Sequence, residues 1–256
     1  MSTEQETVER ASSWCAANGI LMGSSSSSSP FVYEPAPFSL HPTPYPSSAF
    51  RKAYNLSIPF NQMIHNVAAS YTSWLRTAID IAAKGDAEFT GKMVELAEEV
   101  QDTIEKGTQA QRVVLGVLRS DYMLHSPEVA QNDTYKSLED AERLTSTAFK
   151  DAIPLQVELN TIASSFGCLS SKITTMHQAL EDLPYPQRVT KELGGDTSVP
   201  ENTAGENIAE GIAAAFHEYN AQKKNQGVEN NFESVVVMVI EQGDTNSCDQ
   251  VCMLEV

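Results

Sequence analysis

The sequence predicts an α/β (α+β) protein with a helical N-terminal region, a mixed sheet and the start of a parallel α/β unit near its C-terminal end. Three observations support this prediction. Two stretches within 59–107 repeat apolar residues every three or four positions, as amphipathic helices do. Residues 155–160 alternate apolar and polar side chains, which is the period of a half-buried strand. Residues 234–240 form a continuous apolar, β-branched run of the kind that parallel sheets bury on both faces.

Composition limits the classes of partner. The chain has 256 residues and 41% hydrophobic content, so it can bury a substantial core. It carries 34 acidic and 17 basic residues, a formal charge of −17, which repels phosphate backbones and anionic lipid. Nucleic acids and membrane surfaces are therefore poor partners. The first ten residues are polar and acidic, unlike a signal peptide, and we expect a cytoplasmic protein.

The cysteines and histidines do not predict a metal or nucleophile site. A C-x3-C pair near the C-terminal end has no second pair or nearby histidine to complete a tetrahedral zinc site. We expect small buried hydrophobic residues or free thiols at Cys15, Cys168, Cys248 and Cys252. Structural roles are expected for His65, His125, His177 and His217.

The first half of the chain predicts helices around one extended segment. Residues 5–18 read as a short helix that Gly19 ends. The serine- and proline-rich strap at 24–47 cannot form a regular helix, and we expect it to lie over a globular body.

An antiparallel helical pair is expected next. Its first helix runs from Pro59, in the first turn, to Gly85. Asp86 can cap the second helix, which ends at Gly107.

The second half alternates strand-like and helical segments. Residues 111–124 become strand-like, and 126–151 form a polar excursion, either an exposed helix or a long loop. A helix is expected over 168–183, and another after the capping-box pair Thr203 and Glu206. We expect a body over 1–190, a connector over 191–205 and the start of a second unit over 206–256.

Glu158 and Asn160 are the candidate ligands for a cation. On a strand they point to the same face, roughly 6.6 to 6.8 Å apart along the chain. A carboxylate and an amide oxygen suit Mg²⁺, which keeps waters and takes further ligands from substrate phosphates. Ser164 and Ser165 follow as candidate helix caps, where free N–H groups would bind an anion. On spacing alone, a polar strand edge beside a capped helix is the commoner explanation.

Arg119 is the natural complement to these groups. Its guanidinium can bind a ligand carboxylate in a bidentate manner. The alternative is a structural ion pair with Asp121, and the sequence leaves both open.

These segments, taken in order, resemble the eukaryotic-type glutathione synthetase family. The resemblance is carried by LRSDYM (118–123), VELNTIASSFGCLSSK (157–172), AEGIAAAF (209–216), TNSCDQ (245–250) and the strap YEPAPFSLHPTPYP. It implies a homodimeric ligase of the ATP-grasp class that joins γ-glutamylcysteine to glycine with ATP and Mg²⁺. It also implies that 1–190 belongs to the ligase body and that 206–256 begins a substrate-binding domain.

The resemblance implies roles for individual residues. Glu158 and Asn160 would hold Mg²⁺, with Glu158 also near ATP. The residues implied to bind γ-glutamylcysteine are Arg119, Ile162, Ala163, Ser164, Ser165, Asp244, Asn246 and Gln250.

Three departures accompany the resemblance. Ala163 stands where the family pattern I-S-x-S has a serine, and Asp244-Thr245-Asn246 replaces its E-R-N. Family members continue for about as long again, through the lysines and glycine-rich loop that clamp ATP, so this chain alone is expected to be catalytically incomplete. The alternative is a non-catalytic product that binds γ-glutamylcysteine or dimerises with a full-length subunit. An unrelated helical binding module built on 60–106 would leave Arg119 and Glu158 without a function.

Overall fold

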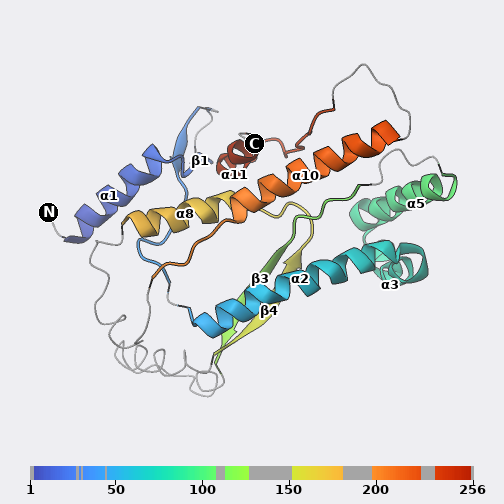
Figure 1. Ribbon diagram of the computed structural model, residues 1–256, viewed down its shortest axis with the longest axis horizontal. Coiled ribbons are helices and arrows are strands. Elements are labelled where there is room, and N and C mark those ends of the chain that lie inside the picture. Colours follow the sequence, from blue (N-terminus) through green and yellow to red (C-terminus); the bar gives the residue numbers. More distant parts are fainter. Residues whose placement is uncertain are drawn as a thin grey trace. The chain divides into compact units, whose positions relative to one another are not determined.

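A computed structural model describes residues 3–26, 29, 31–43, 45–107, 113–126, 152–180, 198–225 and 234–254 (Figure 1). This part of the chain is mostly helical and contains two small sheets, each a pair of antiparallel strands. The expected mixed sheet is therefore wrong for the described residues, where both ladders are antiparallel and neither joins the other.

The chain divides into two compact units. Unit 1 consists of residues 1–53, 117–214 and 235–256, and unit 2 consists of 54–116 and 215–234. The candidate site lies entirely in unit 1. The expected excursion at 126–151 falls outside the described residues except for Ser126, as do residues 191–197 of the expected connector at 191–205.

The N-terminal part of unit 1 is a helix followed by the strap. Helix α1 (Thr3–Ala17) confirms the helix expected at 5–18, and Gly19 follows it with a φ of 68°. Strand β1 (Leu21–Gly23) pairs antiparallel with β2 (Tyr33–Pro35) inside the strap. Beyond β2, Ala36 is buried and Phe38 and Leu40 pack against the core, which confirms that this part of the strap lies over the body.

The second ladder of unit 1 carries the candidate site. Strand β3 (Arg119–His125) pairs antiparallel with β4 (Ile153–Asn160), with a bulge between Asp121 and Tyr122 (Figure 1). The strands expected in 111–124 and 155–160 therefore form. The apolar side of β4 is not buried, however, because Leu155 and Val157 are both exposed.

Three helices complete unit 1: α8 (Gly167–Ala179), the first part of α10 (Ala204–Asn225) and α11 (Ser247–Leu254). Two glycines let α8 and α10 approach closely. A Cβ at Gly167 would lie 2.5 Å from Ile208 Cδ1, and one at Gly205 would lie 3.2 Å from Cys168 Cα. Larger side chains at these positions would push the two helices apart.

The core of unit 1 lies between α1, β1, α8 and α11. Its buried members are Ala11, Cys15, Ile20, Ala36, Leu169, Met176, Leu180 and Cys248. The Cys15 thiol lies 3.5 Å from the Met176 sulfur at the centre of this cluster.

Helix α10 does not begin with the expected capping box. Its first N–H groups bind elsewhere: that of Gly205 donates to Ser171 Oγ at 3.1 Å, and that of Ala204 to Asn202 Oδ1 at 3.1 Å. Thr203 Oγ1 instead accepts a hydrogen bond from the Asn207 side chain. The cap is thus supplied partly by α8, a contact that the local spacing could not reveal.

Two of the four cysteines form a disulfide, which corrects the prediction of thiols at both positions. Cys168 on α8 is bonded to Cys252 on α11, 84 residues away, with 6.3 Å between their Cα atoms. The prediction is confirmed for Cys15 and Cys248, which are buried and free. Burial raises the pKa of both thiols above its ordinary value.

Unit 2 is a series of helical segments. It contains the second part of α2 (Ser47–Ala69), then π-helix η1 (Tyr71–Leu75), α3 (Arg76–Ala78), α4 (Asp80–Gly85), π-helix η2 (Ala87–Gly91) and α5 (Lys92–Glu105). The expected single helix from Pro59 to Gly85 is wrong at its start and in its continuity, because Pro59 lies inside α2 and the helix changes at Ser70. Its expected end is confirmed, since α4 ends at Gly85. There the Ser70 hydroxyl donates to Asn66 O at 2.7 Å, a side-chain bond that disturbs the helical ladder.

The start of η2 and the end of α5, which follows it directly, agree with the sequence prediction. Asp86 accepts hydrogen bonds from the N–H groups of Phe89 and Thr90, at 3.3 and 3.2 Å, so it caps this helical segment as expected. Gly107 follows α5 with a φ of 67°. Tyr71 Oη contacts Val94 O at 3.3 Å and joins η1 to α5.

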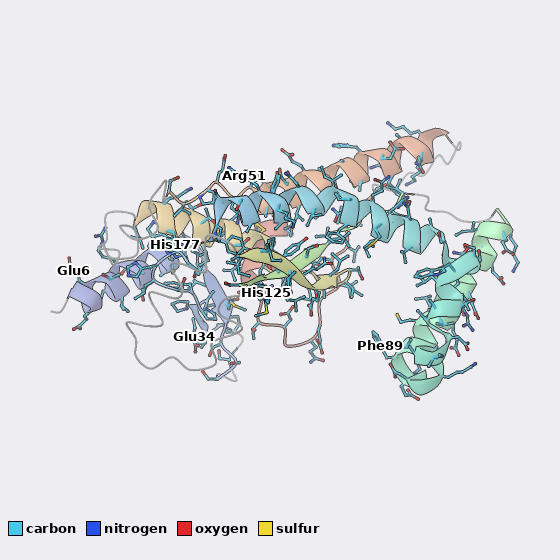
Figure 2. All side chains as sticks on the ribbon, turned by 90° about the horizontal axis from the view of Figure 1, so that it is seen from below. Glu6, Glu34, Arg51, Phe89, His125 and His177 are labelled. Atoms are coloured by element: carbon cyan, nitrogen blue, oxygen red, sulfur yellow. A yellow bond between two sulfur atoms is a disulfide. The ribbon has the colours of Figure 1, made fainter. Side chains whose placement is uncertain are left out.

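The apolar stripe of the second helix is exposed, contrary to the expected buried face. Phe89, which Figure 2 labels, is 66% exposed, and Leu96 is 53% exposed. In the part of unit 2 that the structure describes, only Tyr71 and Val94 are buried hydrophobic residues.

The apolar run at 234–240 does not form the expected strand. These residues adopt no regular structure, and each from Val235 to Ile240 is at least 41% exposed. A strand requires a neighbour for its N–H and C=O groups, and no described segment pairs with this one. Within the described helices, none is long and apolar enough to cross a bilayer.

Candidate functional site

Four polar residues gather on one face of the β3–β4 ladder. Arg119 lies opposite Asn160, and Asp121 lies opposite Glu158. Residues that are directly opposite or two apart share a face, so Glu158 and Asn160 point the same way, as the alternation predicts. Asn160 Nδ2 donates to Asp121 Oδ2 at 3.3 Å and to Arg119 O at 3.4 Å. The amide oxygen of Asn160 and the exposed carboxylate of Glu158 are the groups left for a cation.

Arg119 makes the ion pair with Asp121 that the sequence offered as one alternative. Its Nε and Nη2 donate to the two Asp121 oxygens at 2.8 and 3.0 Å, and its Nη1 donates to Ser165 O at 3.3 Å. The hydrogen bonds to Asp121 raise the pKa of Arg119, and the charge of Glu158 adds to the effect. The same bonds hold the pKa of Asp121 below its ordinary value.

The ion pair does not use all the donors of Arg119. A guanidinium carries five N–H groups, and the bonds to Asp121 and Ser165 engage one on each nitrogen. One N–H of Nη1 and one of Nη2 remain without a partner among the described residues. A ligand carboxylate can accept hydrogen bonds from these N–H groups. The Arg119 side chain is 36% exposed.

The turn that follows β4 has an unusual backbone. Ala163 and Phe166 have φ values of 50° and 75°, in the left-handed region that non-glycine residues seldom adopt. Ser164 Oγ donates to Val117 O and Asn160 O, at 3.1 and 3.3 Å, and so holds the turn against the segment before β3 and the end of β4. Ile162 is 80% exposed at the tip. The turn therefore has a strained backbone at two residues, and side-chain hydrogen bonds hold it in this conformation.

The serines do not cap α8, which corrects the sequence prediction. Ser165 Oγ donates to Ala163 O at 3.3 Å, and the N-cap residue is Phe166, whose side chain makes no cap bond. The Arg119 guanidinium lies 5.8 Å from the centre of the Phe166 ring, so the same residue also contacts the polar face.

Asp249 caps α8 instead, a role that the local sequence pattern does not predict. Its Oδ2 accepts from the N–H of Phe166, and its Oδ1 accepts from the N–H of Leu169 at 3.0 Å. A carboxylate at this end of a helix is also favoured by the helix dipole. The expected free anion site at the helix start is therefore filled by the protein itself. Asp249 lay within the TNSCDQ motif, but nothing local indicated a partner 80 residues earlier.

The three predicted residues of the 244–250 segment join this cap. Asn246 Nδ2 donates to Asp249 Oδ2 at 2.8 Å, and the Asn246 N–H donates to Asp244 Oδ1 at 2.8 Å. Gln250 Nε2 donates to Asp244 Oδ2 at 3.0 Å. The segment is also fixed to β1, since the Gly23 N–H donates to Thr245 O at 2.9 Å. One network of contacts thus runs from β4 through Arg119 and the turn to Gln250.

The donor set is consistent with one kind of metal. Among the described residues, no group of three His, Cys, Asp or Glu side chains is placed to hold an ion. Glu158 and Asn160 supply two oxygen ligands on one face, which fits Mg²⁺ that keeps waters and shares phosphates and does not fit a closed protein cage.

Two other features lie apart from this network. His177 Nε2 lies 2.9 Å from Ser39 O and joins α8 to the strap, the structural role that the sequence predicted (Figure 2). A shallow depression in unit 2 is lined by α2 and η1 residues, from Pro59 to Trp74, and contains none of the predicted site residues.

Comparisons with known proteins identify the family. The description "Eukaryotic glutathione synthase, ATP binding domain" matches residues 1–247. Glutathione synthetase from Dictyostelium discoideum is 27% identical over 248 residues, covering 94% of this chain and 44% of that protein. The Rattus norvegicus glutathione synthetase is 27% identical over 247 residues, covering 96% and 42%. This chain therefore spans less than half the length of the curated relatives that it matches.

A solved structure shares the fold. It is that of a glutathione synthetase-like effector (GSS30) from Globodera pallida in its apo form, with a TM-score of 0.61 and 17% identity. The match covers 98% of this chain and 45% of the other. The match over 1–247 includes the polar strand face, the turn and the start of the 244–250 segment. The chain belongs to the eukaryotic glutathione synthase family.

Proposed function

We propose that the chain is the N-terminal portion of a glutathione synthetase, which joins γ-glutamylcysteine to glycine at the expense of ATP, and that it carries most of the dipeptide site. The observation that supports this most strongly is the contact network that links Arg119, the 162–166 turn and the 244–250 segment. These segments are far apart in sequence and contain every residue implied to bind the dipeptide.

In the proposed site, Arg119 binds a carboxylate of γ-glutamylcysteine. Asp121 fixes the edge of the guanidinium that carries Nε and Nη2, and the remaining N–H groups of the two terminal nitrogens would meet the ligand. Residues of the turn, from Ile162 to Ser165, line the same region. At the other end of the network, the Asp244 carboxylate suits the dipeptide's ammonium group, and Asn246 and Gln250 add amide contacts.

The proposed reaction has two steps. An oxygen of the dipeptide's cysteinyl carboxylate attacks the γ-phosphorus of ATP, forming an acyl phosphate and releasing ADP. The glycine amine then attacks the acyl carbon, forming the peptide bond and releasing phosphate and a proton. Glu158 and Asn160 would hold Mg²⁺, which neutralises phosphate charge when it is bound. Glu158 would also lie near ATP. By analogy with the family, the enzyme would act as a cytoplasmic homodimer.

Binding of γ-glutamylcysteine to the 256-residue chain tests the dipeptide site. Isothermal titration calorimetry should detect it, and Arg119→Ala should weaken it by about tenfold or more, the loss expected for a charge-assisted pair. Arg76→Ala is a matched control, because Arg76 is also 36% exposed and paired with two carboxylates, Asp80 and Glu98. Equal affinity of the Arg119 variant and the wild type would contradict the assignment.

The ligase reaction is tested on the longest product of the gene. Glu158→Ala should greatly reduce ATP- and glycine-dependent synthesis, while Glu95→Ala on the exposed surface of α5 should not. A full rate in the Glu158 variant would exclude the metal role.

A non-catalytic role is the second candidate, and one observation favours it. The apolar stripe of α5 is exposed in unit 2, as a surface for another subunit would be. On this hypothesis the chain binds γ-glutamylcysteine or pairs with a full-length subunit without completing the reaction. Co-expression with the full-length product, followed by affinity capture of one tagged partner, distinguishes the two: capture without added synthesis supports this alternative.

A further inference from the structure

Asp249 occupies a central position in the contact network without being one of the residues implied to bind substrate. Its carboxylate accepts the N–H groups of Phe166 and Leu169 at the start of α8. The same carboxylate accepts Asn246 Nδ2 at 2.8 Å, and the Asp249 N–H donates back to Asn246 Oδ1 at 3.4 Å. Asp249 is therefore the side chain through which the turn and the 244–250 segment are connected.

The backbone at Phe166 explains why such a connection is needed. Phe166 has a φ of 75°, which costs free energy for a residue with a side chain and persists only where its surroundings hold it. Asp249 binds the N–H of this very residue. Arg119 contacts the same part of the turn twice. It donates to Ser165 O at 3.3 Å, and its guanidinium lies over the Phe166 ring. A change in the turn would thus move both of these Arg119 contacts.

Helix α11 holds Asp249 in place from two sides. Cys252, one turn further along the helix, is bonded to Cys168 in the first turn of α8. Before the helix, Ser247 Oγ donates to Leu21 O at 3.1 Å and fixes the segment to β1. Helix α11 is therefore attached to the first turn of α8 twice, by the Cys252–Cys168 disulfide and by the hydrogen bonds of Asp249.

We propose that Asp249 is a positioning residue for the dipeptide site: its carboxylate holds the 162–166 turn and the 244–250 segment in one arrangement, so that the two ends of γ-glutamylcysteine meet preformed partners. The inference rests on the proposed function for the identity of the ligand. It does not require Asp249 to touch the ligand, because both of its oxygens are already engaged by the protein.

The test combines two measurements on the 256-residue chain with its disulfide intact. Hydrogen exchange reports how firmly the amides of 166–169 are held, and calorimetry reports γ-glutamylcysteine affinity. In Asp249→Ala, exchange at 166–169 should be about five- to tenfold faster, the effect of losing an N-cap, and affinity should fall by a similar factor. Asp249→Asn keeps one acceptor oxygen and should give intermediate values, which also covers the case that the alanine variant does not fold.

Asp86→Ala is the matched control, because Asp86 likewise accepts two backbone N–H groups at a helix start, in unit 2. It should speed exchange at 89–90 and leave dipeptide affinity unchanged. Unchanged exchange at 166–169 in both Asp249 variants, or wild-type affinity despite faster exchange, would overturn the positioning role. Lack of any γ-glutamylcysteine binding by the wild-type chain would overturn the proposed function instead, while the exchange result would still decide whether Asp249 holds the turn.

Discussion

The two units of the chain bury their apolar residues to very different extents. Unit 1 has a continuous core in which Cys15, Ile20 and Met176 are completely buried, although its elements are short. In unit 2 the helices are more strongly amphipathic, yet most of their apolar residues are exposed. Amphipathic spacing therefore predicts that a helix has an apolar face, but not that the face is covered.

The difference follows from how each unit is held together. Unit 1 brings distant segments together through a disulfide, a buried cluster and side-chain caps such as Asp249 on α8. Unit 2 is joined by contacts that are closer in sequence, among them the exposed pair of Arg76 and Glu98 at 2.7 Å. Exposed ion pairs contribute little free energy, so unit 2 should be the less stable of the two when it is probed locally.

The largest change in the free energy of unfolding should come from removing the disulfide of unit 1. Cys252→Ser should lower the free energy of unfolding by about 4 kcal/mol, since the bond spans a separation of 84 residues. Urea unfolding with and without a thiol reductant measures this. The reductant should destabilise the wild type by the same amount and leave the variant unaffected, and a wild type that is insensitive to reductant would contradict the prediction.

The next largest change in stability should come from truncating a methionine, and the loss should differ between the two units. Met176→Ala should cost about 3 kcal/mol, because it leaves a cavity in the core of unit 1. Met93→Ala in α5 should cost less than about 0.5 kcal/mol, because Met93 is already 46% exposed. Urea unfolding followed by circular dichroism compares them, with Met176→Leu as the volume-conserving control. Equal losses at the two methionines would show that α5 is covered after all.

Acid should produce the smallest effect and act on both units. The pKa of Asp121 is lowered by its hydrogen bonds to Arg119, and that of Asp86 is lowered by the N–H and hydroxyl groups of Thr90 and the N–H of Phe89. A carboxyl with a lowered folded pKa stabilises the fold above its unfolded value of about 3.9, and that contribution is lost as the pH falls through the folded pKa.

The measurement is the urea midpoint as the pH is lowered from about 6 to about 2, because stability that depends on a lowered carboxyl pKa is lost in acid. Asp121→Asn should flatten the acid dependence in unit 1, and Asp86→Asn should flatten it in unit 2, with hydrogen exchange assigning each change to its unit. Acid profiles identical to the wild type in both variants would mean that neither carboxylate contributes.

Much of the site was predictable from local patterns. The alternation in 155–160 correctly placed Glu158 and Asn160 on one face of a strand. The choice between a ligand role and an ion pair for Arg119 could not be made from spacing. The structure shows the ion pair, in which Asp121 engages Nε and Nη2, and the ligand role stays a proposal. The prediction of serine caps was wrong because the N–H groups at a helix start can donate to any oxygen nearby in space. In this fold that oxygen belongs to Asp249, which is distant in sequence.

The sequence by itself determined the local features: the helix ended at Gly19, the capping of a helix by Asp86, the strand alternation at 155–160 and the acidic charge. These follow from backbone dihedrals and periodicities that act over a few residues. Only the tertiary structure decided that Cys168 meets Cys252, that Asp249 caps α8 and that 234–240 pairs with no described segment. Each of these depends on segments that are distant along the chain, and no short-range preference specifies which of them will meet.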